Sequence, residues 1–281
     1  MKKYVELIRI KHWVKNILLF IPLVCAKAIT NENVIAIILG FFAFSFTASF
    51  IYIINDIRDI EKDKLHPRKK KRPLPSGKIK KSTAMIIAAV ILIISVLINT
   101  YINKSVFNLS FYLLMAYIII NICYRLGLKN IAIIDIALLT SGFVIRVYYG
   151  AAVINVLVSN WLFLTILTGS LFLGLGKRKK ELQHNKEARK VLEEYNESFL
   201  DKFGYVALAL MLVFYSLWTL EQNIDYLVFT IPLLIVIFMK YSLIIEKTDE
   251  GDPTTVLYQD KSLLVLCTLY GLLMILLLVV I

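Results

Sequence analysis

Cysteine and histidine are scarce in this sequence of 281 residues, which contains three of each. The cysteines lie far apart within apolar segments, so they show neither a metal-ligand spacing nor a disulfide framework. The histidines form no HxxxH pair, and the sequence therefore gives no indication of a zinc site. The six residues concerned are Cys25, Cys123, Cys267, His12, His66 and His184.

Long polar segments are also missing, and acidic residues are outnumbered. The chain is 59% hydrophobic with a mean hydropathy of +0.73, and 32 basic against 20 acidic residues give a net charge of +12. Apolar residues in long unbroken runs predict a polytopic membrane protein rather than a soluble domain. Charged residues throughout the start of the chain argue against a signal peptide. Because no soluble domain is available to present a groove, we expect no nucleic-acid partner.

Nine hydrophobic runs are each near the roughly 20 residues that a helix needs to cross a bilayer. An N-terminus in the cytoplasm places 29 of the 32 basic residues on the cytoplasmic side, as the positive-inside rule favours. We therefore predict an all-α integral membrane protein of the cell membrane, with the N-terminus cytoplasmic, the C-terminus outside, and a single domain over residues 1–281. The nine predicted spans are about 14–31, 35–56, 83–102, 107–124, 131–153, 158–176, 204–221, 225–245 and 262–281.

Three aspartates follow the second span closely. Asp56, Asp59 and Asp63 stand at i, i+3 and i+7, so on a helix their carboxylates share one face. Like charges on one face repel unless a cation lies between them, and hard oxygen ligands favour Mg²⁺ held together with substrate phosphates. Asn55 can add a neutral oxygen ligand. We interpret these residues as a metal-diphosphate site at the cytoplasmic membrane surface.

A solvated charged loop is the plainer interpretation of the same stretch, since most charge runs are solvated. Against it, Asp56 lies at the end of an apolar run, where ionisable groups are rare and usually functional. The basic run from Arg68 to Arg72 could hold further phosphate oxygens. The cytoplasmic segments at about 57–82 and 177–203 are therefore expected to carry the active site.

Two charged residues, Asp135 and Arg146, lie within the fifth span. Eleven residues separate them, which is roughly 16 Å along a helix axis, so each needs a partner of its own. A functional cavity is the default expectation for such charges, and hydrogen bonds to other spans are the alternative. At the end of the sixth span, Glu181 could simply pair with Lys177 on the helix.

These stretches resemble the UbiA-type polyprenyltransferase superfamily, whose mark is an NDxxDxxxD motif after the second helix, here Asn55, Asp56, Asp59 and Asp63. Within the superfamily the sequence is most similar to the decaprenyl-phosphate phosphoribosyltransferases. The resemblance covers nearly the full length and implies a nine-helix bundle. The segments that carry it are RIKHWVKN (9–16), YIINDIRDIEKDKLHPRKKKRP (52–73), YRLGLKN (124–130), IDIALLTSGFVIRVYYGA (134–151), GSLFLGLGKRKKEL (169–182) and DPTTVLYQDK (252–261).

Aromatic prenyltransferases of this superfamily carry a second acidic motif, DxxxD, after the sixth span. Here that position reads Lys177-Arg178-Lys179-Lys180-Glu181, a basic cluster that suits another phosphate better than a second cation. Phosphoribosyl diphosphate carries a 5-phosphate besides its diphosphate, and the acceptor is itself a lipid phosphate. The reversal of charge therefore favours phosphoribosyl transfer over prenyl transfer.

The resemblance implies transfer of 5-phosphoribose from phosphoribosyl diphosphate to a polyprenyl phosphate, with Mg²⁺ as cofactor, for cell-envelope polysaccharide synthesis. Asp56, Asp59 and Asp63 would be catalytic and, with Asn55, would hold the metal. Transfer of an isoprenyl group to an aromatic acceptor is the alternative, and a lipid-phosphate transporter is a third. The residues expected to contact substrate are Lys15, Arg72, Tyr124, Lys129, Arg146, Lys177, Arg178 and Glu181.

Overall fold

The structure is a computed structural model that describes residues 2–67, 69–184, 189–248 and 251–280. Within these ranges every regular element is a helix, which confirms the predicted all-α class. The elements are α1 (Lys2–Ile8), η1 (Ile10–Phe20), α2 (Ile21–Cys25), α3 (Asn31–Arg58), α4 (Ile60–Leu65), η2 (Lys69–Lys71), α5 (Lys81–Asn103), α6 (Leu109–Leu126), η3 (Leu128–Asn130), α7 (Ile134–Val153), α8 (Asn160–His184), η5 (Lys190–Glu194), α9 (Glu197–Glu221), η6 (Asp225–Phe229), α10 (Thr230–Lys247), α11 (Pro253–Gln259), α12 (Lys261–Ile275) and η7 (Leu276–Val280).

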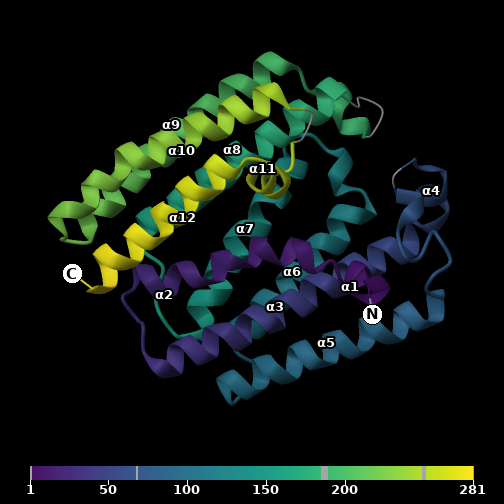
Figure 1. Cartoon of the computed structure of the whole chain (residues 1–281). Coiled ribbons are helices and arrows are strands. Elements are labelled where there is room, and N and C mark those ends of the chain that lie inside the picture. The colour runs from purple at the N-terminus through teal and green to yellow at the C-terminus, as the bar shows by residue number, and fades with distance from the viewer. Residues whose placement is uncertain (1, 68, 185–188, 249–250, 281) are drawn as a thin grey trace.

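The helices form two groups that meet at α7 (Figure 1). The N-terminal group holds α3, α5 and α6, and the C-terminal group holds α8, α9, α10 and α12. The segment η1–α2 crosses between them and packs against both α3 and α7. Residues 10–25 near the N-terminus are therefore placed between the two helix groups.

Seven of the described helices are long and apolar enough to cross a membrane, and the protein is a multi-pass membrane protein. They correspond to seven of the nine predicted spans: Asn31–Arg58, Lys81–Asn103, Leu109–Leu126, Ile134–Val153, Glu197–Glu221, Asp225–Lys247 and Lys261–Val279. The first predicted span is divided into η1 and α2, and the sixth lies in α8, whose last turns are highly charged. The count of nine spans and the orientation stay predictions.

Local chemistry explains where several helices begin. Thr30, Asn108 and Asn196 each accept a hydrogen bond from the backbone N–H three residues later, at the starts of α3, α6 and α9. Asp252 and Asp260 cap α11 and α12, accepting from the backbone N–H groups of Thr254 and Leu263. These caps satisfy backbone donors that the first turn of a helix leaves unpaired.

A close approach between η1 and α7 fixes the position of the N-terminal segment. A Cβ added at Gly150 would lie 2.1 Å from the carbonyl oxygen of Leu19, so only glycine allows this contact. Leu19 then joins a buried cluster with Phe44 of α3 and Tyr149 of α7. As a result, the polar residues of η1 face α7 near Arg146.

The predicted loops contain more helix than the sequence indicated. The segment 57–82 contains α4 and η2, and α4 ends at Leu65 before His66-Pro67, since the residue before proline avoids the helical region. The segment 177–203 continues α8 through His184 and then contains η5. Arg68 and residues 185–188 of these two segments lie outside the described residues.

Candidate active site

The acid motif lies where α3 passes into α4. α3 ends at Arg58 and α4 begins at Ile60, but the backbone N–H groups of Asp59 and Asp63 still donate to carbonyls four residues earlier, at 3.1 and 2.8 Å. The three aspartates therefore keep the helical spacing that the sequence predicted.

Asp56 and Asp63 converge on one cation, the guanidinium of Arg72. The Nη1 atom of Arg72 lies 3.3 Å from Oδ1 of Asp56 and 2.7 Å from Oδ2 of Asp63, and both aspartates are buried. Arg9, which stands between α1 and η1, also donates to Oδ1 of Asp56. The two buried carboxylates repel one another, and the positive charge of Arg72 and Arg9 offsets that repulsion.

Asp59 points to a different partner, Arg125 at the end of α6, whose Nη1 lies 2.5 Å from its Oδ2. Among the residues that the structure describes, no three His, Cys, Asp or Glu side chains converge closely enough to hold a metal ion. The donor set still fits one, because Asp56 and Asp63 already face a common cation and all the candidate ligands are hard oxygens. In this arrangement a guanidinium lies between the two aspartates.

A cavity of about 120 Å³ lies between η1, α3, α6 and α7. Arg146 of α7 and Lys15 of η1 give it a positive lining, and Tyr124 and Asn121 of α6 add polar groups. Its other lining residues are Tyr52, Tyr117, Ile120, Leu138, Leu139, Gly142 and Phe143.

Arg146 is buried, and its described hydrogen bonds go to neutral acceptors. Nε donates to Oδ1 of Asn16 at 2.8 Å, Nη1 to the carbonyl of Gly142 at 2.5 Å, and Nη2 to the hydroxyl of Tyr117 at 3.0 Å. The rings of Phe44, Tyr117 and Phe143 lie close to the guanidinium. These contacts orient the side chain but leave its charge available to an anion in the cavity.

A second polar network surrounds Arg178 on α8, whose side chain is fully buried. Nε donates to Asp135 at 2.5 Å, Nη1 to Glu181 at 2.6 Å, and Nη2 to the hydroxyl of Tyr124 at 3.0 Å. Arg189 donates to the same tyrosine and lies 3.1 Å from the same glutamate. Glu181 therefore pairs with these two arginines, and its suggested pairing with Lys177 does not occur.

Asp135 receives a further hydrogen bond from Tyr195, which follows η5, at 2.6 Å. Burial and this hydrogen bond raise the pKa of Tyr195, so the phenol stays protonated and donates. Asp135 and Arg146 thus have separate partners, as their spacing predicted. Asp135 is also in the first turn of α7, where the helix dipole favours a negative charge.

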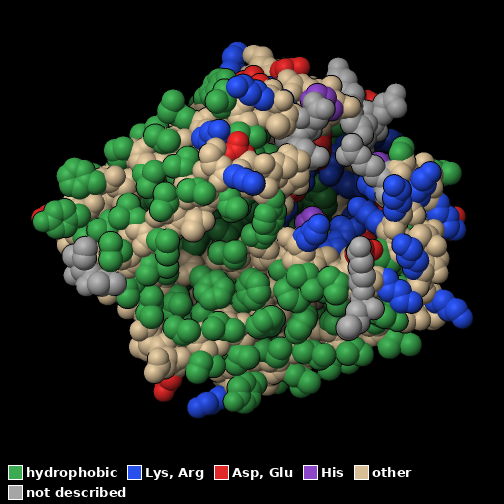
Figure 2. Space-filling view, viewed as in Figure 1, with side chains coloured by type: hydrophobic (Ala, Val, Ile, Leu, Met, Phe, Trp, Pro, Cys, Tyr) green, Lys and Arg blue, Asp and Glu red, His purple; other side chains and the backbone are tan. Residues whose placement is uncertain are grey.

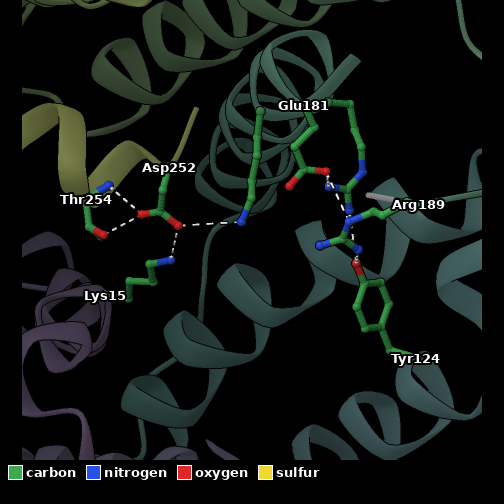
Figure 3. A network of polar contacts seen from close by, with 8 residues as sticks. Lys15, Tyr124, Glu181, Arg189, Asp252 and Thr254 are labelled. Atoms are coloured by element: carbon green, nitrogen blue, oxygen red, sulfur yellow. Dashed lines mark hydrogen bonds and ion pairs between the residues drawn. The ribbon is translucent and has the colours of Figure 1, made fainter. Parts of the chain in front are cut away.

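A third network centres on Asp252, just before α11 (Figure 3). Its Oδ2 lies 3.0 Å from Nζ of Lys15 and 3.5 Å from Nζ of Lys177, while its Oδ1 accepts from the backbone N–H and hydroxyl of Thr254. Burial alone would raise the pKa of Asp252, but the two ammonium groups outweigh it and hold that pKa below its usual range.

Basic side chains also gather at one end of the molecular surface. Hydrophobic side chains cover the body of the bundle, whereas lysine and arginine side chains gather over the end that carries α4 (Figure 2). A hollow lined in part by basic side chains opens beside them. The candidate site is thus a basic cavity at one end of an apolar bundle.

Comparison with known proteins identifies the family. Residues 18–266 match the UbiA prenyltransferase family. The chain belongs to that family. This UbiA family member is accordingly a membrane-bound transferase, which confirms the resemblance seen in its motifs.

Two relatives and one solved structure are similar over most of the chain. The decaprenyl-phosphate phosphoribosyltransferase of Mycolicibacterium smegmatis is 31% identical over 93% of this chain and 88% of its own length. The protein of that name from Corynebacterium glutamicum is 33% identical over 93% of this chain and 82% of its own. A UbiA homologue from Archaeoglobus fulgidus, bound to GPP and Mg²⁺, has a TM-score of 0.74 at 19% identity, over 97% of this chain and 99% of its own. That last likeness shows the UbiA fold.

Most of the predicted site residues of this UbiA protein lie in these networks. Asn55 is half-buried on α3 beside the acid motif. Lys129 lies in η3, where burial lowers the pKa of its ammonium group and the nearby Arg125 and Arg189 lower it further. The predicted residues that take part in these ion pairs and hydrogen bonds or line the cavity are Asp56, Asp59, Asp63, Arg72, Lys15, Tyr124, Arg146, Lys177, Arg178 and Glu181.

Several residues of these networks were not predicted, among them Arg9, Asn16, Arg125, Arg189 and Asp252. Arg9, Asn16 and Asp252 lie in segments that carried the family resemblance, and Arg125 is next to a residue that was predicted. For these residues, their place in or beside those segments was the feature of the sequence that could have indicated a role in the site. Arg189 lies in none of the segments that carried the family resemblance.

Proposed function

We propose that this protein transfers 5-phosphoribose from phosphoribosyl diphosphate to a polyprenyl phosphate and releases diphosphate. The observation that carries the proposal is the cavity lined by Arg146 and Lys15, where a buried guanidinium with neutral acceptors faces open space. A buried cation of this kind favours an anionic ligand. The two relatives of about one-third identity bear the name of this activity, and they are similar over nearly the whole chain.

Mg²⁺ is proposed as the cofactor, with Asp56, Asp59, Asp63 and Asn55 as its ligands. Bound there, it would offset the negative charge that develops on the leaving diphosphate. The A. fulgidus homologue of the same fold binds Mg²⁺ with a prenyl diphosphate, which supports a divalent metal. The arginines now paired with the acids, Arg9 and Arg72, would then be free to contact phosphate oxygens.

The remaining residues bind and orient the two anionic substrates. The anomeric carbon loses diphosphate and bonds to an oxygen of the lipid phosphate, which approaches from the opposite face, so the configuration inverts. Because a phosphate oxygen is already ionised at neutral pH, no side chain is needed as general base. The proposed contacts are Lys15, Arg72, Tyr124, Lys129, Arg146, Lys177 and Arg178, with Glu181 orienting Arg178.

The basic end of α8 supports a donor richer in phosphate than an isoprenyl diphosphate. Lys177 and Arg178 point into two separate networks on either side of the helix, and both networks border the cavity through Lys15 and Tyr124. A substrate pair that carries phosphates at several points could engage both networks. We further propose nine spans, a cytoplasmic active site in the cell membrane, and a product used for cell-envelope polysaccharide.

The test is a transfer assay on the purified protein in detergent. With Mg²⁺, labelled phosphoribosyl diphosphate and a polyprenyl phosphate, it should form a labelled lipid, and a chelator should stop the reaction until Mg²⁺ is restored. An aromatic acid with an isoprenyl diphosphate should give no product. Product in the second reaction and none in the first would make the protein an aromatic prenyltransferase instead.

A further inference from the structure

Asp252 brings together three segments that are far apart in the sequence. Lys15 comes from η1 near the N-terminus, Lys177 from α8, and Asp252 itself from the segment before α11 (Figure 3). Both ammonium groups approach the same carboxylate oxygen, Oδ2, at 3.0 and 3.5 Å. They can therefore be no farther apart than the sum of these two distances, a gap that one phosphate group can bridge with N–H···O contacts of about 2.8 Å.

The carboxylate is also held from the side opposite the lysines' oxygen, through its Oδ1, by Thr254. Its Oδ1 accepts two hydrogen bonds from Thr254, and Pro253 stands in the first turn of α11. A Cβ added at Gly251 would lie 2.9 Å from Cβ of Lys180 and 3.2 Å from the carbonyl oxygen of Lys177, so the chain passes directly against α8 here. Thr254 and the close packing against α8 therefore help to fix the position of Oδ2.

The network keeps a net positive charge and an open side. One carboxylate faces two ammonium groups, and the side chains of Lys15, Lys177 and Asp252 are 16%, 22% and 22% exposed. Lys15 also lines the cavity that contains Arg146. The cations of this network are distinct from those that neutralise the acid motif, which are Arg9, Arg72 and Arg125.

Asp260 provides an internal comparison. It caps α12 through a backbone N–H and a hydroxyl, as Asp252 caps α11, and its Oδ2 lies 3.4 Å from Nζ of Lys240. This aspartate meets one lysine where Asp252 meets two, and Lys240 does not line the cavity, whereas Lys15 does. Asp260 therefore shares the helix cap and a lysine partner with Asp252 but has no second lysine among the described residues, which makes it a suitable control for a phosphate subsite.

We propose that Asp252 is a positioning residue that holds Lys15 and Lys177 as a pair, and that this pair binds a phosphate monoester. The phosphate comes from one of two sources, the 5-phosphate of the ribosyl donor or the head group of the polyprenyl phosphate. This choice of sources rests on the proposed function. Asp252 does not touch the phosphate. It prevents the two like charges from separating and keeps Lys177 beside Lys15, which lines the cavity.

The first measurement is binding without turnover, on the full chain in detergent. The probes are ribose 5-phosphate and farnesyl phosphate, each titrated into the wild type, Asp252→Asn and the matched control Asp260→Asn. Asparagine can still accept from Thr254, so the cap is kept while the charge is lost. We expect about tenfold weaker binding of one probe to Asp252→Asn, with the other probe and the control unchanged.

The second measurement separates positioning from general damage. In the transfer assay, Asp252→Asn should raise KM for the substrate that carries the affected phosphate and leave kcat within about twofold. Lys177→Gln should raise the same KM, and the double variant should be no worse than the poorer single variant, because both changes disrupt one pair.

Several outcomes overturn the proposal: unchanged binding of both probes, equal weakening of both, tighter binding to Asp252→Asn, or fully additive effects with Lys177→Gln. The last two would mean that the carboxylate competes with the ligand or acts independently of Lys177. Failure of the proposed function is distinguishable, because a wild type that makes no labelled lipid but loses affinity for one probe on Asp252→Asn substitution retains the phosphate subsite.

Discussion

Replacing Arg178 by methionine should leave a buried carboxylate without its cation. The side chains of Arg178 and Asp135 are both 0% exposed, and their atoms meet at 2.5 Å. After the substitution, the hydroxyl of Tyr195 would be the one side-chain donor left to Asp135 among the described residues. Removal of one partner of a buried ion pair costs about 3–5 kcal/mol, so we expect a loss of that size in the free energy of unfolding.

The neighbouring Lys179 supplies a matched control. Its own side chain is 11% exposed, but its partners Asp201 and Glu246 are 32% and 56% exposed, so water can solvate both carboxylates after the substitution and the loss should be about 1 kcal/mol or less. Unfolding by denaturant in detergent micelles, followed by circular dichroism, should therefore separate Arg178→Met from Lys179→Met by at least about 2 kcal/mol. Adding Asp135→Asn to Arg178→Met should recover part of the loss, because the unpaired charge is removed. Equal stability of the two single variants would refute this reasoning.

Three further changes test other parts of the site. Asp56→Asn should lower turnover by about a hundredfold or more while the protein stays folded, and the exposed Glu61→Gln should not; equal activity of the two in the transfer assay would remove the metal-site assignment. His12 has its pKa lowered to about 4 by burial and by nearby cations, so the unfolded chain binds the extra proton between about pH 4 and 6.5. Stability of the wild type should then be fully present above that window and fall through it, as followed by thermal melting, and His12→Gln should flatten the fall; identical pH profiles would contradict the shift. Gly251→Ala should lower the melting temperature because its Cβ meets Lys180, whereas Gly204→Ala, with open space around it, should not.

The spacing of residues along single helices was predictable. Asp56, Asp59 and Asp63 keep the expected helical register, and Asp135 and Arg146 have separate partners because they are too far apart to meet. Seven apolar runs were also located correctly, since hydropathy and length are properties of one segment. Helical spacing and apolar length are properties of one segment, so they can be predicted without knowing how the segments pack together.

The contacts between distant segments were not predictable. Arg9 and Arg125 pair with acids 47 and 66 residues away, and no pattern in one sequence shows which arginine will face which aspartate. The first predicted span is divided at Phe20–Ile21, where η1 packs tightly against Gly150 of α7 through Leu19 and Pro22 stands in the first turn of α2. The convergence of Lys15 and Lys177 on Asp252 is of the same kind, since it depends on how the two helix groups meet.

The contact between Lys15 and Asp252 joins residues 237 positions apart. During synthesis, the N-terminal anchor and the acid motif emerge from the ribosome long before the segment that carries Asp252. A nascent chain interrupted between Lys177 and that segment would contain the acid motif, Arg146 and both lysines, yet Lys15 and Lys177 would lack the carboxylate of Asp252. Completion of the phosphate-binding end is therefore linked to insertion of the last helices, so partly made chains in the membrane would lack the finished site.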